Sequence, residues 1–449
     1  MKPFFTLLFL MFVAISGIRA QEKALSIPHT VYTLDNGLTV ILHEDRTVPM
    51  VTVNVWYHVG SSYEKPKRTG FAHLFEHIMF EGSGNVKEGD FDNLLEAVGG
   101  NNNGSTTQDR TDYYETLPAN ALDLALFLES DRMGYLLEAM SPGKVDGQRD
   151  VVKNERRQNT ENRPYGIATQ TILENFYPKG HPYNWPVIGY MDDLTAASYE
   201  DVVEFFKKYY APNNAVLVIA GDIEPTKTIE KVKHWFNEIP RGEVVTRPTA
   251  PAFELIGEKK LTVEDNVQLP RLYLAYQTPA LYTPGDAEMD VAADVLAKGK
   301  NSRLYKRLVY ELQIAQNVSA YQNGNALGGM FMVMATARPG IKLTQLQSII
   351  DEEIGKLTIT PPTEREVQRV VNQNESRILR QMESSMNKAD MLQSYYRFAG
   401  NPDWLNEDFS RYKALQPSDI SASARQYLNP KKRVVLSIVP KGKADLAVQ

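Results

Sequence analysis

The second half of this chain repeats the first, and that repeat limits the fold more than any other feature. A constant shift of 218 residues aligns two separate blocks in one register. Residues 71–77 fall on residues 289–295, and the other matches are Asp201 with Asp419, Tyr209 with Tyr427, Pro212 with Pro430 and Val216 with Val434. Two distant blocks in one register indicate a duplication. Since 449 residues also exceed one ordinary core, we expect two homologous halves.

Local patterns predict both helices and strands in these halves. Asp35-Asn36-Gly37 lies between two apolar runs, which is a strong signal for a β-hairpin, and residues 50–59 alternate as a strand. Further apolar patterns predict helices at residues 71–80, 118–139, 143–162 and 198–210, and a buried strand at 215–220. The predicted fold class is therefore α+β, with two homologous α/β sandwich halves joined by a linker.

Three boundaries divide the chain. Residues 1–20 are typical of a cleavable signal peptide, because Lys2 precedes a short apolar run and a small-residue cleavage site follows. An uncleaved anchor is the alternative interpretation. Residues 243–260 are rich in Pro, Gly and charge and are the predicted linker. The first domain then covers residues 21–242 and the second covers 261–449.

Composition excludes several classes of partner and ligand. The chain has no cysteine, so disulfides and thiolate ligands are excluded, and any metal must be bound by His, Asp or Glu. Loss of Lys2 and Arg19 with the signal peptide leaves 49 − 2 = 47 basic residues against 55 acidic ones, a net charge of −8. This argues against nucleic acid as a partner. No later run reaches about 18 apolar residues, so no stable membrane anchor is expected.

The segment His73-Leu74-Phe75-Glu76-His77 has the form H-x-x-E-H. On a helix, residues i and i+4 lie one turn apart on the same face, so both imidazoles can reach one ion. Glu76 leans toward that face, where a carboxylate can act as the base for a metal-activated water. The shift of 218 places Val291 and Val295 opposite the two histidines, so only the first half carries this set.

A hydrolytic zinc site needs three protein ligands and one open position for water. The helix predicted at residues 143–162 offers Glu155 and Glu161 as the third ligand. Val151 and Val152 share a helical face with Glu155, which draws this carboxylate toward the core, whereas Glu161 lies among polar neighbours. Periodicity therefore favours Glu155.

With these motifs the sequence resembles the pitrilysin-type zinc peptidases, the inverzincins of family M16, over essentially the whole mature chain. The matching segments are residues 70–80, Gly99-Gly100-Asn101-Asn102 with Thr106 and Tyr113, residues 149–155, His181-Pro182-Tyr183 with Ile188-Gly189, and residues 210–214. The resemblance implies one Zn²⁺ per chain, held by His73, His77 and Glu155, with Glu76 as the catalytic base. The family has its third ligand at about the separation found here between His77 and Glu155.

The resemblance also implies that an extended peptide substrate adds to an edge strand of the catalytic half. In this chain that strand would run through Asn102, Asn103, Gly104, Ser105 and Thr106. Glycine and short polar side chains suit a close approach of two backbones. An ordinary Asn/Gly turn after a helix is the alternative interpretation of this segment.

Two departures from the family pattern qualify these expectations. Gln148 stands where members often have a second Glu that supports the site. Val309 and Gln316 stand where active members carry an Arg and a Tyr that hold the substrate carbonyl. Short family members work as dimers, and one chain can bring the zinc while another brings the Arg/Tyr pair. We therefore expect a heterodimer with an M16 paralogue that lacks H-x-x-E-H, with a homodimer as the alternative.

The expected function is that of a secreted, periplasmic zinc metalloendopeptidase that hydrolyses peptides or small unfolded proteins. Two other functions are open: an inactive scaffold subunit of a larger complex, and a protein with structural zinc. The intact zinc motif argues against the first. The presence of Glu76 argues against the second, because a closed structural site has no use for a base.

Overall fold

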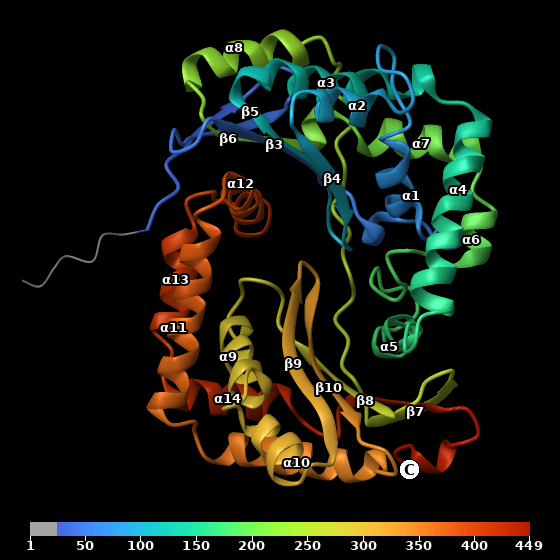
Figure 1. The fold of residues 1–449 in the computed structure, drawn as a ribbon, viewed down its shortest axis with the longest axis vertical. Helices are drawn as coiled ribbons and strands as arrows, with labels where there is room; N and C mark the ends of the chain where they lie inside the picture. The colour runs from blue at the N-terminus through green and yellow to red at the C-terminus, as the bar shows by residue number, and fades with distance from the viewer. Residues whose placement is uncertain (1–24) are drawn as a thin grey trace, which may run out of the picture.

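The computed structural model describes residues 25–449, and the signal peptide predicted at residues 1–20 lies outside the described residues. The molecule has two mixed sheets, one in each half, with helices packed against them (Figure 1). No helix in the described part is long and apolar enough to cross a membrane.

The two sheets share one topology. Their strand orders are β1-β2-β6-β3-β5-β4 and β7-β11-β8-β10-β9. The strands of the first sheet are β1 (Thr30–Thr33), β2 (Thr39–Glu44), β3 (Met50–Tyr57), β4 (Asn101–Thr106), β5 (Thr111–Pro118) and β6 (Ala215–Gly221). Those of the second are β7 (Glu258–Asp265), β8 (Arg271–Thr278), β9 (Ala315–Asn325), β10 (Gly328–Ala337) and β11 (Arg433–Pro440).

In each sheet one pair is parallel, β2 with β6 and β7 with β11, and the other pairs are antiparallel. Without β1, the two orders match strand for strand. The prediction of two homologous α+β halves is therefore confirmed.

The helices of the first half are α1 (Phe71–Ile78), α2 (Asp90–Ala97), α3 (Leu122–Ala139), α4 (Pro142–Arg156), α5 (Ala168–Phe176), α6 (Met191–Thr195), α7 (Tyr199–Tyr209) and α8 (Pro225–Phe236). Those of the second are α9 (Asp286–Ala297), α10 (Leu343–Ile359), α11 (Glu364–Gln381), α12 (Ser385–Ser394), α13 (Leu405–Lys413) and α14 (Pro417–Tyr427).

The helix expected at 143–162 is shorter, because α4 ends at Arg156 and a wider π turn follows. Asn159 and Thr160 in that turn are weak helix formers whose side chains compete for backbone groups.

Each half lends one helix to the sheet of the other half. α5 packs on β11, and its Ile172 and Phe176 share a core with Leu436. In return α12 packs on β3 and β6 (Figure 1). There the buried Gln393 amide donates to the carbonyls of Asn54 and Val216, at 3.0 and 2.8 Å. This reciprocal exchange fixes the two halves against each other.

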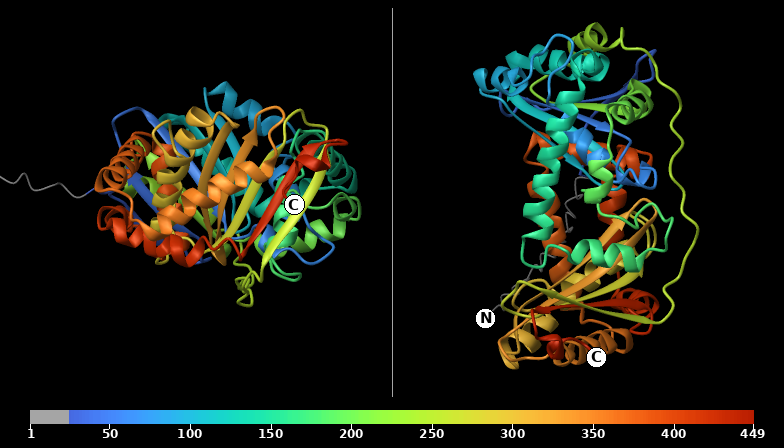
Figure 2. Two further views of the ribbon diagram at one scale, coloured as in Figure 1. Left: turned by 90° about the horizontal axis from the view of Figure 1, so that it is seen from below. Right: turned by 90° about the vertical axis from the view of Figure 1, so that its right-hand side faces the viewer.

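The segment from residue 240 to residue 257, here called the linker, forms neither helix nor strand. It runs along one side of the molecule from the first half to the second (Figure 2, right). β7 begins at Glu258, inside the predicted linker of residues 243–260.

Candidate active site

The helix that carries H-x-x-E-H, α1, is held at its N-terminus by a buried carboxylate. Glu64 accepts hydrogen bonds from the backbone amides of Gly70 and Ala72, at 3.0 and 2.8 Å, and from Trp185 Nε1 at 2.9 Å. A carboxyl oxygen there accepts from open N–H donors at the positive end of the helix. Burial raises the pKa of Glu64 to about 8, against the effect of these three donors. Sequence reasoning missed Glu64, whose partner Trp185 is 121 positions away.

A glycine pair then brings the loop after α5 against α1. Gly70 lies at the N-cap with φ 86°, and a Cβ on Gly189 would lie 2.4 Å from the Gly70 Cα. Arg156, buried on α4 beside Glu155, donates to the Gly189 carbonyl. The Ile188-Gly189 motif therefore joins α1 and α4, the two helices that carry the predicted ligands.

The three predicted ligands converge at the junction of α1 and α4. His73 Nε2 and His77 Nε2 lie 3.6 and 3.3 Å from Glu155 Oε2, and the three ligand atoms all lie within 4.8 Å of one another. Zinc bonds of about 2.0–2.2 Å in tetrahedral geometry separate neighbouring ligand atoms by about 3.4 Å. The donor set and its spacing fit a zinc ion. Burial lowers the pKa of His73 to about 4, so its imidazole is neutral, as a metal ligand must be.

The surroundings of Glu155 differ in one respect from the predicted face. Val152 is buried, but Val151 is 46% exposed, so the expected core position of Val151 is wrong. Successive helical residues turn by about 100°, and here the step from Val152 back to Val151 leaves the core. Glu155 itself is partly buried, and Asn159 donates to its Oε1 at 3.3 Å. Glu161 is exposed and lies 3.4 Å from Arg156 Nε, as an ion pair outside the ligand set.

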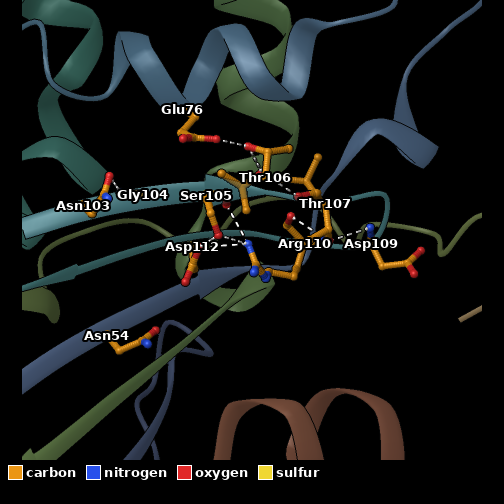
Figure 3. A network of polar contacts seen from close by, with 12 residues as sticks. Asn54, Glu76, Asn103, Gly104, Ser105, Thr106, Thr107, Asp109, Arg110 and Asp112 are labelled. Carbon is orange, nitrogen blue, oxygen red and sulfur yellow. Dashed lines mark hydrogen bonds and ion pairs between the residues drawn. The ribbon is translucent and has the colours of Figure 1, made fainter. Parts of the chain in front are cut away.

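Glu76 is oriented by the neighbouring edge strand. Its Oε2 accepts a hydrogen bond of 2.6 Å from Thr106 Oγ1 on β4 (Figure 3). Its Oε1 makes no hydrogen bond within residues 25–449. A Cβ on Gly104 would lie 3.2 Å from Glu76 Cγ, so the glycine leaves room for this side chain. Burial raises the pKa of Glu76, as suits a group that takes up a proton.

The predicted substrate segment, Asn102 to Thr106, forms strand β4 rather than a turn. β4 ends the first sheet and pairs only with β5, so its other edge has no strand partner among the described residues. Thr106 faces Glu76, whereas Ser105 faces the other side and bonds to Asp112 and Arg110 (Figure 3). A free edge beside the ligand cluster is what strand addition by a peptide requires.

The three positions that depart from the family pattern do not reach the ligands. Gln148 Nε2 donates to Glu81 Oε1. Val309 packs against the core of the second half, and Gln316 is exposed on β9, the edge strand of the second sheet. Nearby Arg303 is bound to Glu366 by two contacts of 2.8 and 3.1 Å.

Comparison with known proteins agrees with these observations. The model of the insulinase (peptidase family M16) domain matches residues 39–184, and the model described as the peptidase M16 inactive domain matches residues 196–374. The zinc protease PqqE of Helicobacter pylori is 28% identical over 417 residues, covering 92% of this chain and 93% of the relative. A crystal structure of a protease from Helicobacter pylori superposes with a TM-score of 0.87 at 28% identity, covering 93% of this chain and all of that one.

A plant protein is also similar. It is the probable mitochondrial-processing peptidase subunit beta of Arabidopsis thaliana, which is 25% identical over 94% of this chain and 81% of its own length.

Proposed function

This chain belongs to the M16 peptidase family, and on that premise we propose that it is a zinc-dependent endopeptidase that cleaves peptides or small unfolded proteins. The observation that supports this most is the convergence of His73, His77 and Glu155 next to a carboxylate that is not part of the set. That carboxylate, Glu76, has one oxygen bonded to Thr106 and the other without a hydrogen-bond partner among the described residues. A structural metal site would not need it.

The ligands would be His73 Nε2, His77 Nε2 and one carboxylate oxygen of Glu155. A zinc ion bound by them supplies Lewis acidity and lowers the pKa of water toward about 7. Glu76 takes the proton from the attacking water and delivers it to the leaving amine. Thr106 fixes Glu76 through its hydroxyl, so the orientation of the base depends on the strand that receives the substrate.

The substrate would lie as an additional strand along the free edge of β4, from Asn102 to Thr106. Backbone hydrogen bonds to an edge strand favour extended peptides of many sequences. Successive side chains of the bound substrate would point to opposite faces of the sheet. One face carries Glu76 and the ligands, and the other carries Ser105 and Arg110. Selection by extended conformation suits unfolded proteins and peptides.

The proposal also covers where the protein acts and which partner it binds. The apolar segment at residues 4–15 and the absence of cysteine favour an exported, periplasmic protein. Val309 and Gln316 cannot supply the Arg/Tyr pair, which favours a heterodimer with an M16 paralogue. One relative is itself named as a subunit of a processing peptidase.

The test combines elemental analysis with hydrolysis of a quenched peptide by the mature chain. We expect one zinc per chain, loss of zinc in Glu155→Gln, and zinc-dependent cleavage that increases with the paralogue. Glu161→Gln is the matched control, because it changes a nearby glutamate outside the ligand set. Equal zinc content in both variants would exclude this ligand set, and a zinc-loaded heterodimer that cleaves nothing would indicate a scaffold.

A further inference from the structure

A basic hollow lies where the linker meets both halves, and it contains none of the residues assigned to the active site. We call it the linker pocket; its cavity volume is about 190 Å³. Arg241 and Arg247 come from the linker, His58 and Tyr63 from the first half, and Arg397 from the turn after α12 in the second half. Three separate parts of the chain thus contribute to one small cavity.

The arginines of the linker pocket lack salt-bridge partners in the described part of the chain. Arg241, Arg247 and Arg397 form no ion pair with a carboxylate among residues 25–449. Partial desolvation and then the positive charge of Arg397 lower the pKa of Arg247, although the residue is exposed at the surface. Folding therefore brings like charges together, which costs free energy unless an anion lies between them.

Asp109, a carboxylate on which the charge of Arg397 acts, makes its hydrogen bonds with other groups. Asp109, which lines the adjoining cavity, accepts hydrogen bonds from Tyr183 Oη at 2.7 Å and from the Ala326 amide at 3.0 Å. These bonds hold the β4–β5 turn against the β9–β10 turn. Asp109 is thus part of the contact between halves, and its side chain forms no ion pair with Arg397.

Buried donors in the linker pocket lack acceptors. Arg397 is only 7% exposed; its Nη2 donates to Tyr63 Oη at 2.8 Å, while its Nε has no partner. His58 Nε2 is also buried without a partner. A buried polar group left unpaired costs about 1–3 kcal/mol, more when it is charged. These are the groups that an oxyanion in the pocket would satisfy.

The linker is held so that its arginines stay at the pocket. Asn213 uses both ends of its amide on the linker backbone: Oδ1 accepts from the Gly242 amide at 2.8 Å, and Nδ2 donates to the Glu243 carbonyl at 3.1 Å. Arg241 directly precedes these two residues. The basic side chains are therefore held in place before any ligand binds.

We propose that the linker pocket binds a phosphate-class oxyanion that pairs with Arg241, Arg247 and Arg397 and so fastens the linker to both halves. Guanidinium groups match tetrahedral oxyanions through paired hydrogen bonds, and phosphate carries enough charge and acceptors to serve several of them. This inference does not depend on the peptidase activity.

Inorganic phosphate is the probe, titrated calorimetrically into the mature Glu76→Gln chain at constant ionic strength set with sodium chloride. We expect saturable binding, and a rise in Tm of about 2 °C at ten times the Kd. Arg397→Gln should weaken binding by about 30-fold or more, the usual effect of losing one partner of a buried charge pair. Arg247→Gln, at an exposed position, should weaken binding by about 2- to 5-fold. Arg163→Gln, at an exposed position outside the pocket, should bind as the parent does.

Arg247 is exposed on the linker, so its variant tests the site even if Arg397→Gln does not fold. Absence of phosphate binding, or equal affinity in Arg247→Gln and in Arg163→Gln, would overturn the proposal. Acetate that binds as tightly as phosphate would also overturn it, because the site would then select carboxylates. None of these results bears on hydrolysis by the zinc-loaded chain.

Discussion

Each half places a carboxylate of its first helix above a glycine of its edge strand, but the two carboxylates are used differently. In the first half Glu76 of α1 lies above Gly104 of β4. In the second half a Cβ on Gly324 of β9 would lie 2.8 Å from Asp286 Oδ1 of α9. The two pairs are similar in arrangement but not aligned by the repeat, because the shift of 218 residues places Asp294 opposite Glu76 and Gln322 opposite Gly104.

The partners of these carboxylates differ. Asp286 is 2% exposed; its Oδ2 accepts from the Tyr282 amide at 3.0 Å and pairs with Arg411 at 3.3 Å. Its Oδ1 accepts from Gln322 Nε2 at 3.4 Å. Within residues 25–449, the hydroxyl of Thr106 is the only hydrogen-bond partner of the Glu76 carboxylate. A carboxylate whose oxygens are all engaged is structural, whereas one with a free oxygen is available for proton transfer.

Helices α1 and α9 differ in the same way. The repeat aligns His73 and His77 with Val291 and Val295, and both valines are fully buried in the core of the second half. The fold can therefore be built with apolar residues at these positions. Polar residues kept at sites where the fold does not need them indicate function.

The largest effect should come from making α1 like α9. In His73→Val/His77→Val we expect zinc to fall from one per chain to none and hydrolysis to fall to background. The free energy of unfolding in EDTA should stay within about 1 kcal/mol of the parent, because the repeat accommodates valine there. Elemental analysis, a peptide assay and urea denaturation would measure these changes. If the double variant retained stoichiometric zinc, His73 and His77 would not be its ligands, and the proposed difference between α1 and α9 would be wrong.

A smaller effect should come from removing only the base. Glu76→Gln should keep its zinc while kcat falls by about 10²–10⁴-fold, because an amide cannot accept the proton of water at neutral pH. Asp286→Asn is the matched control in the second half, and it should leave kcat unchanged at a cost in stability. Turnover near that of the parent in Glu76→Gln would show that Glu76, like Asp286, is structural.

Addition of the partner should raise activity by about 10²–10³-fold, the usual contribution of one donor to the oxyanion. Val309 has no donor, and Arg303 is bound to Glu366. The isolated chain should therefore bind zinc and cleave slowly, and the M16 paralogue should restore the rate in a mixed-subunit titration. If the isolated chain is a fully active homodimer that the paralogue does not stimulate, the division of labour between chains is wrong.

The repeat and the local motifs were sufficient to predict the fold class, the two matching halves and the helices that carry the proposed ligands, but not the order of the strands. The shift of 218 residues predicted two matching halves, and helical spacing brought His73 and His77 to one face. Periodicity selected Glu155, although Val151, used in that argument, is exposed. Helical spacing can be read from sequence because it depends only on the geometry of neighbouring residues, and the repeat can be read because the two halves keep the same order of residues.

The contacts that orient the site could not be predicted in this way. The cap of α1 by Glu64 and the bond between Thr106 and Glu76 join separate elements, and Gln393 contacts Asn54 across 339 positions. Polar pairs at such separations have no period in the sequence. Only the exchange of α5 and α12 and the order of the strands bring them together.

The smallest effect should come from the contact that separates Glu76 from Asp286, the single hydroxyl of Thr106. Thr106→Val keeps the shape and the strand pairing with Thr111 but removes the 2.6 Å hydrogen bond to Glu76 Oε2. A hydrogen bond to a charged group contributes about 1.5–3 kcal/mol, and we expect part of this, a loss of about 10-fold in kcat. Thr106 positions the base without touching the metal, so zinc content and KM should not change.

Two variants make this last test specific. Thr106→Ser retains the hydroxyl, so its kcat should stay close to that of the parent. Ser105→Ala alters the opposite face of β4, where Ser105 donates to Asp112, and should leave kcat unchanged. If Thr106→Val and Ser105→Ala lower kcat equally, the effect belongs to the strand as a whole. If kcat of Thr106→Ser is as low as that of Thr106→Val, the methyl group of Thr106 matters more than its hydroxyl. In that case Glu76 is oriented by packing and not by a polar contact, unlike Asp286, which is held by Tyr282 and Arg411.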